Sequence, residues 1–254
     1  MKQELHYFLT ALAFFTRIPI PKWVEYSDES LNKSRKYFPA VGWIVGGFSA
    51  LVFWLALQLL PIAVAVILAV IAGILLTGAF HEDGFADVCD GFGGGYTKEQ
   101  ILRIMKDSRI GVYGAIGMFL LVLLKIIALC EVAKVDPFLL VPVFIAAHST
   151  SRFIASTLVH SHAYVRDTDS SKSRPIAATH LSTGEMFFSF LLAILPLLFL
   201  PGWLTILPFT VGYGAKIYLG YYFKEHIGGY TGDCLGAIQQ VSEALFYVTV
   251  VAIC

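Results

Sequence analysis

Four acidic side chains lie within nine residues of segment 81–91, HEDGFADVCDG. On a helix, Asp83, Asp87 and Asp90 are spaced i, i+4 and i+7, so their carboxylates share one face, one turn apart. Like charges at this spacing repel each other unless a cation neutralises them. Mg²⁺ prefers oxygen ligands and keeps coordination positions for water and substrate phosphates. We therefore predict a magnesium site with these three ligands, assisted by Glu82, which points off the shared face.

Two other interpretations of the acidic segment explain less. A solvated helix end whose acids only set topology would carry mixed charges, and acids contribute little to topology. A zinc site built on His81 and Cys89 lacks a third and a fourth ligand at a suitable spacing. The four cysteines are scattered and form no CxxC pair, so the sequence indicates neither a zinc site nor a disulfide framework.

A basic segment, residues 104–114 (IMKDSRIGVYG), follows the acids. Lys106 and Arg109 are three residues apart, which would place them on one helical face. Cations beside a metal–carboxylate cluster suit a di- or triphosphate, because the metal bridges some oxygens while Lys and Arg bind the others. Ordinary positive charge on the cytoplasmic side of a membrane protein is the alternative explanation.

Two further polar features lie later in the chain. In segment 228–237 (GGYTGDCLGA), glycines can present backbone N–H groups to an anion, and Thr231 or Asp233 can cap the helix that follows. Asp233 could instead accept a proton or bind metal. Arg152 lies in a largely apolar run, where a buried arginine needs a partner, either a loop acid or a substrate phosphate.

The composition is that of an integral membrane protein. Hydrophobic residues make up 57% of the 254 residues, charged residues only 14%, and the mean hydropathy is +0.73; a soluble domain has about 25% charged residues. We predict one domain (1–254) of the all-α class, a polytopic helical bundle preceded by an interfacial helix near residues 5–15 with Phe8, Leu12 and Phe15 on one face. About seven apolar runs approach the length that a bilayer requires: 38–60, 62–80, 111–131, 138–160, 186–201, 203–222 and 236–254.

The loops between these runs differ in charge. One set (16–37, 81–110, 161–185 and 223–235) holds thirteen basic residues, whereas Lys134 is the only one in the opposite set. Positive charge marks the cytoplasmic side. We therefore predict that every polar motif faces the cytoplasm. The thirteen are Arg17, Lys22, Lys33, Arg35, Lys36, Lys98, Arg103, Lys106, Arg109, Arg166, Lys172, Arg174 and Lys224.

Taken together, these motifs resemble the cobalamin synthase family, the membrane-bound adenosylcobinamide-GDP ribazoletransferases. The resemblance covers most of the chain, and the acidic motif followed by MKDSRIG is its most specific part. Phe85 and Phe92 depart from the leucines expected there, and residues 161–185 match only loosely. The matching stretches are FTRIP (15–19), FP (38–39), VG (41–42), TG (77–78), DG (83–84), AD (86–87), DG (90–91), MKDSRIG (105–111), SR (151–152), Gly229, TGD (231–233) and GA (236–237).

The resemblance implies a phosphotransferase of the final steps of cobalamin biosynthesis, Mg²⁺-dependent and located in the cytoplasmic membrane of a prokaryote. A hydroxyl of α-ribazole, or of its 5′-phosphate, attacks the cobinamide-side phosphorus of adenosylcobinamide-GDP, and GMP leaves. Lys106 and Arg109 would neutralise the leaving phosphate, and His81 and Asp233 both remain candidates for the base. The residues expected to bind substrate are Arg17, Arg152, Thr231, Lys172 and Arg174. The family implies no nucleic-acid partner; the ribazole form and any homo-oligomer stay open.

Other classes fit less well. Residues 87–91 (DVCDG) imitate the start of the CDP-alcohol phosphotransferase signature, but Gly94 and Gly95 replace its Ala-Arg pair and the downstream aspartates are missing. A membrane prenyltransferase would need a second aspartate-rich cluster. A cation-coupled transporter usually places its site near the bilayer midplane, often within repeats, whereas these acids lie at a membrane boundary in a chain without a repeat.

Overall fold

The computed structural model describes residues 2–165, 180–202 and 206–254. The predicted all-α class is confirmed, because these residues form helices and one isolated β-bridge, between Tyr164 and Tyr230. In chain order the helices are α1 (Lys2–Phe15), α2 (Asp28–Ser34), η1 (Arg35–Tyr37), α3 (Phe38–Leu57), α4 (Ile62–Thr77), α5 (Phe80–Gly94), α6 (Lys98–Ile104), α7 (Val112–Val135), η2 (Pro137–Leu139), α8 (Leu140–Ser156), α9 (Leu158–Ser161), α11 (Thr183–Ile194), η3 (Leu195–Phe199), α12 (Ile206–Ile227) and α13 (Gly232–Ile253).

Four helices of the described part are long and apolar enough to cross a membrane: Asp28–Leu57, Val112–Val135, Pro137–Ser161 and Gly232–Ile253. A fifth span results if α4 and α5, which are bent by 90°, count as one. The remaining apolar runs correspond to the shorter helix Thr183–Phe199 and to α12. The structure therefore confirms an apolar helical bundle with four or five candidate spans, whereas the count of seven stays a prediction.

A sharp break separates α4 from α5. Gly78 and Ala79 have φ angles of 66° and 57°, in the left-handed region, where Gly78 caps α4. A non-glycine residue is uncommon in this region. The Arg17 guanidinium packs against Gly78, and the Arg17 backbone N–H donates to the Leu76 carbonyl at 2.8 Å. The acidic segment is therefore a helix of its own that starts at this break, not a straight continuation of α4.

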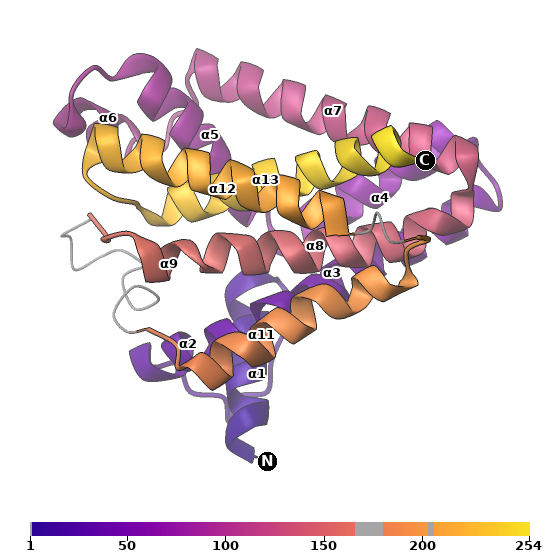
Figure 1. Cartoon of the computed structure of the whole chain (residues 1–254), viewed down its shortest axis with the longest axis horizontal. Coiled ribbons are helices and arrows are strands. Elements are labelled where there is room, and N and C mark those ends of the chain that lie inside the picture. The colour runs from indigo at the N-terminus through magenta and orange to yellow at the C-terminus, as the bar shows by residue number, and fades with distance from the viewer. Residues whose placement is uncertain (1, 166–179, 203–205) are drawn as a thin grey trace.

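The central helices of the bundle are α8 and α13. In each, 72% of the apolar window is buried, against 28% in α7. Figure 1 shows α7 along one side of the bundle and α11 with α1 along the other, with α8 and α13 between them. Helix α3 approaches α8 closely through Gly42 and Gly46, a small-xxx-small pattern that lets two backbones touch.

This close approach predicts a difference between two neighbouring glycines. A Cβ added at Gly46 would lie 2.6 Å from the Phe144 carbonyl oxygen, whereas a Cβ at Gly47 would meet nothing within 4 Å. Gly46→Ala is expected to destabilise the protein by about 1–3 kcal/mol, as overpacked cores do. Gly47→Ala, its control on the same helix, is expected to be neutral or slightly stabilising. Thermal unfolding in detergent measures both, and equal midpoints would contradict the tight α3–α8 contact.

Candidate active site

The acidic helix α5 packs directly against the start of α13. A Cβ at Gly84 would lie 3.0 Å from the Asp233 Cα, and a Cβ at Gly236 would lie 3.1 Å from the His81 carbonyl oxygen. Thr231 is the N-cap of α13 and accepts from the Cys234 backbone N–H at 3.4 Å, so of the two predicted caps it is Thr231 that serves. The glycines thus bring two segments that are 150 residues apart in sequence into backbone contact.

This packing gathers three of the predicted acids. Asp83 is exposed and Asp87 is half-buried, and both lie on α5 within one turn of Gly84, which is the residue that approaches the Asp233 backbone. The Thr231 hydroxyl lies 3.4 Å from Asp233 Oδ2. Among the described residues, no group of three or more His, Cys, Asp or Glu side chains is arranged to hold a metal ion. We call Asp83, Asp87 and Asp233 the carboxylate rim; among the described residues they form no closed metal cage.

Asp90 has a different environment from the other two acids of its face. Its Oδ2 accepts from the Gly111 backbone N–H at 2.7 Å, and its Oδ1 accepts from that of Gly114 at 2.8 Å. Its side chain is buried and satisfies backbone donors at the N-terminus of α7, where a negative charge is also favoured by the helix dipole. These contacts assign Asp90 to fixing α7 on α5 and do not support the prediction that it is a metal ligand.

The predicted common helical face for Lys106 and Arg109 is wrong, because α6 ends at Ile104. Asp107 Oδ1 accepts from the Arg109 backbone N–H at 3.1 Å, a local side-chain contact that competes with helical hydrogen bonding. Arg109 Nη2 also pairs with Asp107 Oδ2 at 2.6 Å, and this lowers the pKa of the Asp107 carboxyl to about 2. Both basic side chains are exposed in a turn that leads into Gly111.

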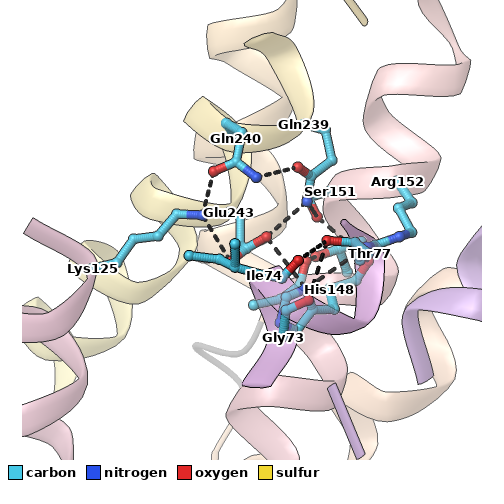
Figure 2. Close-up of polar contacts among 12 residues, drawn as sticks. Gly73, Ile74, Thr77, Lys125, His148, Ser151, Arg152, Gln239, Gln240 and Glu243 are labelled. Carbon is cyan, nitrogen blue, oxygen red and sulfur yellow. Dashed lines mark hydrogen bonds and ion pairs between the residues drawn. The ribbon is translucent and has the colours of Figure 1, made fainter. Parts of the chain in front are cut away.

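A buried polar network lies deeper between α7, α8 and α13 (Figure 2). Lys125 Nζ lies 2.9 Å from Glu243 Oε1 and donates to Gln240 Oε1 at 2.6 Å. His148 Nδ1 lies 3.3 Å from Glu243 Oε2, and Arg152 Nη1 lies 3.2 Å from the same His148 nitrogen. Arg152 therefore has a partner on its own helix, within the buried interior, and the structure shows no ion pair between it and a loop acid among the described residues.

The buried polar network is joined to the acidic helix. Gln240 Nε2 donates to Glu82 Oε1 at 2.9 Å and to Gln239 Oε1 at the same distance, and Gln239 Nε2 donates to Glu243 Oε2 at 2.7 Å. A cavity of about 30 Å³ adjoins these groups and is also lined by His81. Glu82 thus points into the bundle, away from the rim formed by the other acids.

Sequence reasoning had missed most of this network. The residues absent from the predicted site are Lys125, His148, Gln239, Gln240 and Glu243. A signal was present, since an ionisable residue inside a membrane segment is a functional-site hypothesis by default. Lys125 lies within the predicted 111–131 run and Glu243 within the 236–254 run. Their pairing could not be read from the sequence, because 118 residues separate them.

Three of the remaining predicted residues, His81, Glu82 and Arg152, line the buried cavity. His81 is 4% exposed, and its ring stacks on Phe15 with centroids 5.2 Å apart. Arg17 is exposed at the break before α5. Lys172 and Arg174 lie outside the described residues. The structure therefore brings together two sets of the thirteen residues proposed from the sequence. One set, where α5 meets α13, is Asp83, Asp87, Thr231 and Asp233, and the other, around the buried cavity, is His81, Glu82 and Arg152.

Comparison with known proteins identifies the family of this chain. The family described as cobalamin-5-phosphate synthase (CobS) matches residues 7–251. An adenosylcobinamide-GDP ribazoletransferase of Shewanella frigidimarina is 48% identical over 251 residues, which are 99% of this chain and 96% of that protein. Enzymes of the same name from Shewanella sp. (strain W3-18-1) and Shewanella putrefaciens are 46% identical over 99% of this chain and 95% of theirs. No solved structure matches. The chain belongs to the cobalamin-5-phosphate synthase family.

Proposed function

We propose that this chain is an adenosylcobinamide-GDP ribazoletransferase. It joins adenosylcobinamide-GDP to α-ribazole, or to its 5′-phosphate, and releases GMP, which gives adenosylcobalamin or its 5′-phosphate. The observation that carries this proposal is the contact between Gly84 and Asp233, which places the acids of α5 beside the start of α13. Relatives that share this name align over nearly their whole length.

Asp83 and Asp87 are the residues that would hold Mg²⁺. Protein sites for Mg²⁺ usually supply one or two carboxylates and leave the other positions to water and substrate phosphates. The carboxylate rim fits this pattern, since Asp83 is exposed, Asp87 is half-buried, and no closed cluster exists among the described residues. When bound, the ion would neutralise charge on the pyrophosphate of the donor substrate.

The protein's own side chains supply positioning and charge, which dominate phosphoryl transfer. Lys106 and Arg109 are exposed beside the acidic helix, where they bind the phosphate of the leaving GMP. Asp233 is the better-placed base for the attacking hydroxyl, because it is partly accessible while His81 is buried against Phe15. Asp90 keeps the start of α7 on α5, so the basic turn stays near the acids.

The proposed setting is the inner membrane of a bacterium, with the carboxylate rim on the cytoplasmic face. The thirteen-to-one distribution of basic residues supports this orientation. Both substrates are polar, since one carries a nucleotide and the other is a nucleoside or its 5′-phosphate, and a cytoplasmic site can receive them. Counting α11 with η3, and α12, as two further spans gives the seven predicted from the sequence.

Release of GMP tests the function. Purified protein in detergent, given adenosylcobinamide-GDP, α-ribazole and Mg²⁺, is expected to form GMP and the joined corrinoid in equal amounts. Omitting α-ribazole is the control and should abolish both products. A cation-coupled transporter would form neither product and would need a sealed vesicle to show any activity, so absence of GMP would remove the proposal.

A further inference from the structure

A second pocket lies between the end of α8, α9, α11 and α12. Its volume is about 630 Å³, within the range of about 300–1,000 Å³ typical of small-molecule sites. We call it the α11–α12 pocket. Its lining includes Phe153, His160, Phe190, Phe209, Tyr213 and Lys216, and no lining residue is acidic.

One wall of the α11–α12 pocket is aromatic. The Phe153 ring lies 5.6 Å from that of Phe190 and 6.3 Å from that of Phe209, which stacks with Tyr213 at 6.2 Å. Contacts of this kind offer both faces and edges to a flat ring. The wall therefore suits a planar aromatic group.

The part of the pocket next to the aromatic wall is cationic. Lys216 is only 5% exposed, and its Nζ contacts the Ser161 hydroxyl at 3.2 Å and the Tyr213 ring at 5.2 Å from its centroid. No carboxylate of residues 2–165, 180–202 or 206–254 forms an ion pair with it, in contrast to Lys125, which meets Glu243. His160 also lines the pocket, and its Nε2 is buried without a hydrogen-bond partner. A buried ammonium without a counter-charge is costly, so this part of the pocket suits an anion.

We propose that the α11–α12 pocket binds the ribazole acceptor in its 5′-phosphate form, with the aromatic base on the phenylalanine wall and the phosphate at Lys216. This proposal rests on the transferase function proposed above. Both phosphates of the GDP donor lie at the reacting centre and need the carboxylate rim with its cation. A metal-free cationic site suits a phosphate that takes no part in the reaction, and the acceptor 5′-phosphate is that group.

Two backbone hydrogen bonds connect the segment after the pocket with the segment that leads into α13. Directly after α9, the Val165 N–H donates to the Tyr230 carbonyl at 3.0 Å, and the Tyr230 N–H donates to the Ala163 carbonyl at 2.9 Å. Tyr230 immediately precedes Thr231, the cap of α13. The segment that follows the pocket therefore runs beside the segment that carries Asp233.

Steady-state kinetics of Lys216→Met, with α-ribazole and its 5′-phosphate as alternative acceptors, test the proposal. Loss of a charge-assisted contact to phosphate is expected to raise the KM for the phosphorylated acceptor about 10-fold or more. The KM for unphosphorylated α-ribazole and both kcat values should stay within about 2-fold. Lys224→Met is the matched control, since Lys224 is exposed on the same helix and should change neither KM. Tyr213→Leu, a second variant, should raise both KM values alike, because it alters the aromatic wall.

Other outcomes separate the alternatives. Equal effects of Lys216→Met on both acceptors would show a structural role, and unchanged KM values would place the acceptor elsewhere; each overturns the proposal. A lipid headgroup is another source of phosphate. The activity of the wild-type protein could depend on added phosphatidylglycerol, and Lys216→Met could lose this dependence with both acceptors. That result would show that the pocket binds a lipid headgroup, and it would also overturn the proposal. Failure of the transferase function itself would appear as no GMP from the wild-type protein with either acceptor.

Discussion

Asp87→Asn is expected to lower kcat by about 100-fold or more, the loss typical of removing one group that stabilises charge in a transition state. The amide keeps the shape of the side chain but removes the charge that a divalent cation needs. Turnover of purified protein with both substrates, measured across a range of Mg²⁺ concentrations, gives the result. The midpoint of the Mg²⁺ dependence should move to higher concentration, because a ligand has been lost.

Asp90→Asn is the informative comparison on the same helix. Asp90 uses both oxygens to hold the backbone N–H groups of Gly111 and Gly114, so its loss should cost about 1 kcal/mol of stability, as lost helix caps do. The Mg²⁺ midpoint of Asp90→Asn should stay close to that of the wild type. Glu99→Gln changes an exposed acid on α6 and should affect neither property. Near-normal turnover of folded Asp87→Asn would remove the metal-site proposal.

Local patterns predicted the local features of this chain well. The acidic segment is a helix, Thr231 caps α13, and the apolar runs are helices because their composition allows no other way to satisfy the backbone in a membrane. The family resemblance rested on the same short motifs, and the comparisons confirm it.

Features that depend on distant contacts were not predictable from spacing. The break at Gly78 and Ala79 turns the acidic helix by 90°, and the left-handed conformation of an alanine has no sequence signature. Asp90 looked equivalent to Asp83 and Asp87 in periodicity, yet only the folded chain brings the start of α7 to it. Arg109 is exposed and lies outside a helix, because the Asp107 side chain accepts the backbone N–H that a helix would use.

Glu243→Gln is expected to be the most destabilising change in the buried polar network, by about 3–5 kcal/mol, because it leaves Lys125 buried without a counter-charge. Both side chains are nearly inaccessible, at 6% and 5% exposure. Lys125→Met should cost less, since Glu243 keeps its contacts with His148 and Gln239. The double variant should be more stable than Glu243→Gln alone, because it no longer buries the Lys125 ammonium without its counter-charge.

A double-mutant cycle measured by unfolding in detergent isolates this coupling. The exposed pair Lys134–Glu131 on α7 has a similar N–O distance, 2.7 Å, but side-chain exposures of 62% and 47%. Its cycle, with Lys134→Met and Glu131→Gln, should give a coupling below about 1 kcal/mol, as surface pairs do. Equal coupling energies in the two cycles would mean that burial does not strengthen the interaction between Lys125 and Glu243. A large coupling would instead make the pair the anchor that holds Gln240, and through it Glu82, at the inner face of the acidic helix.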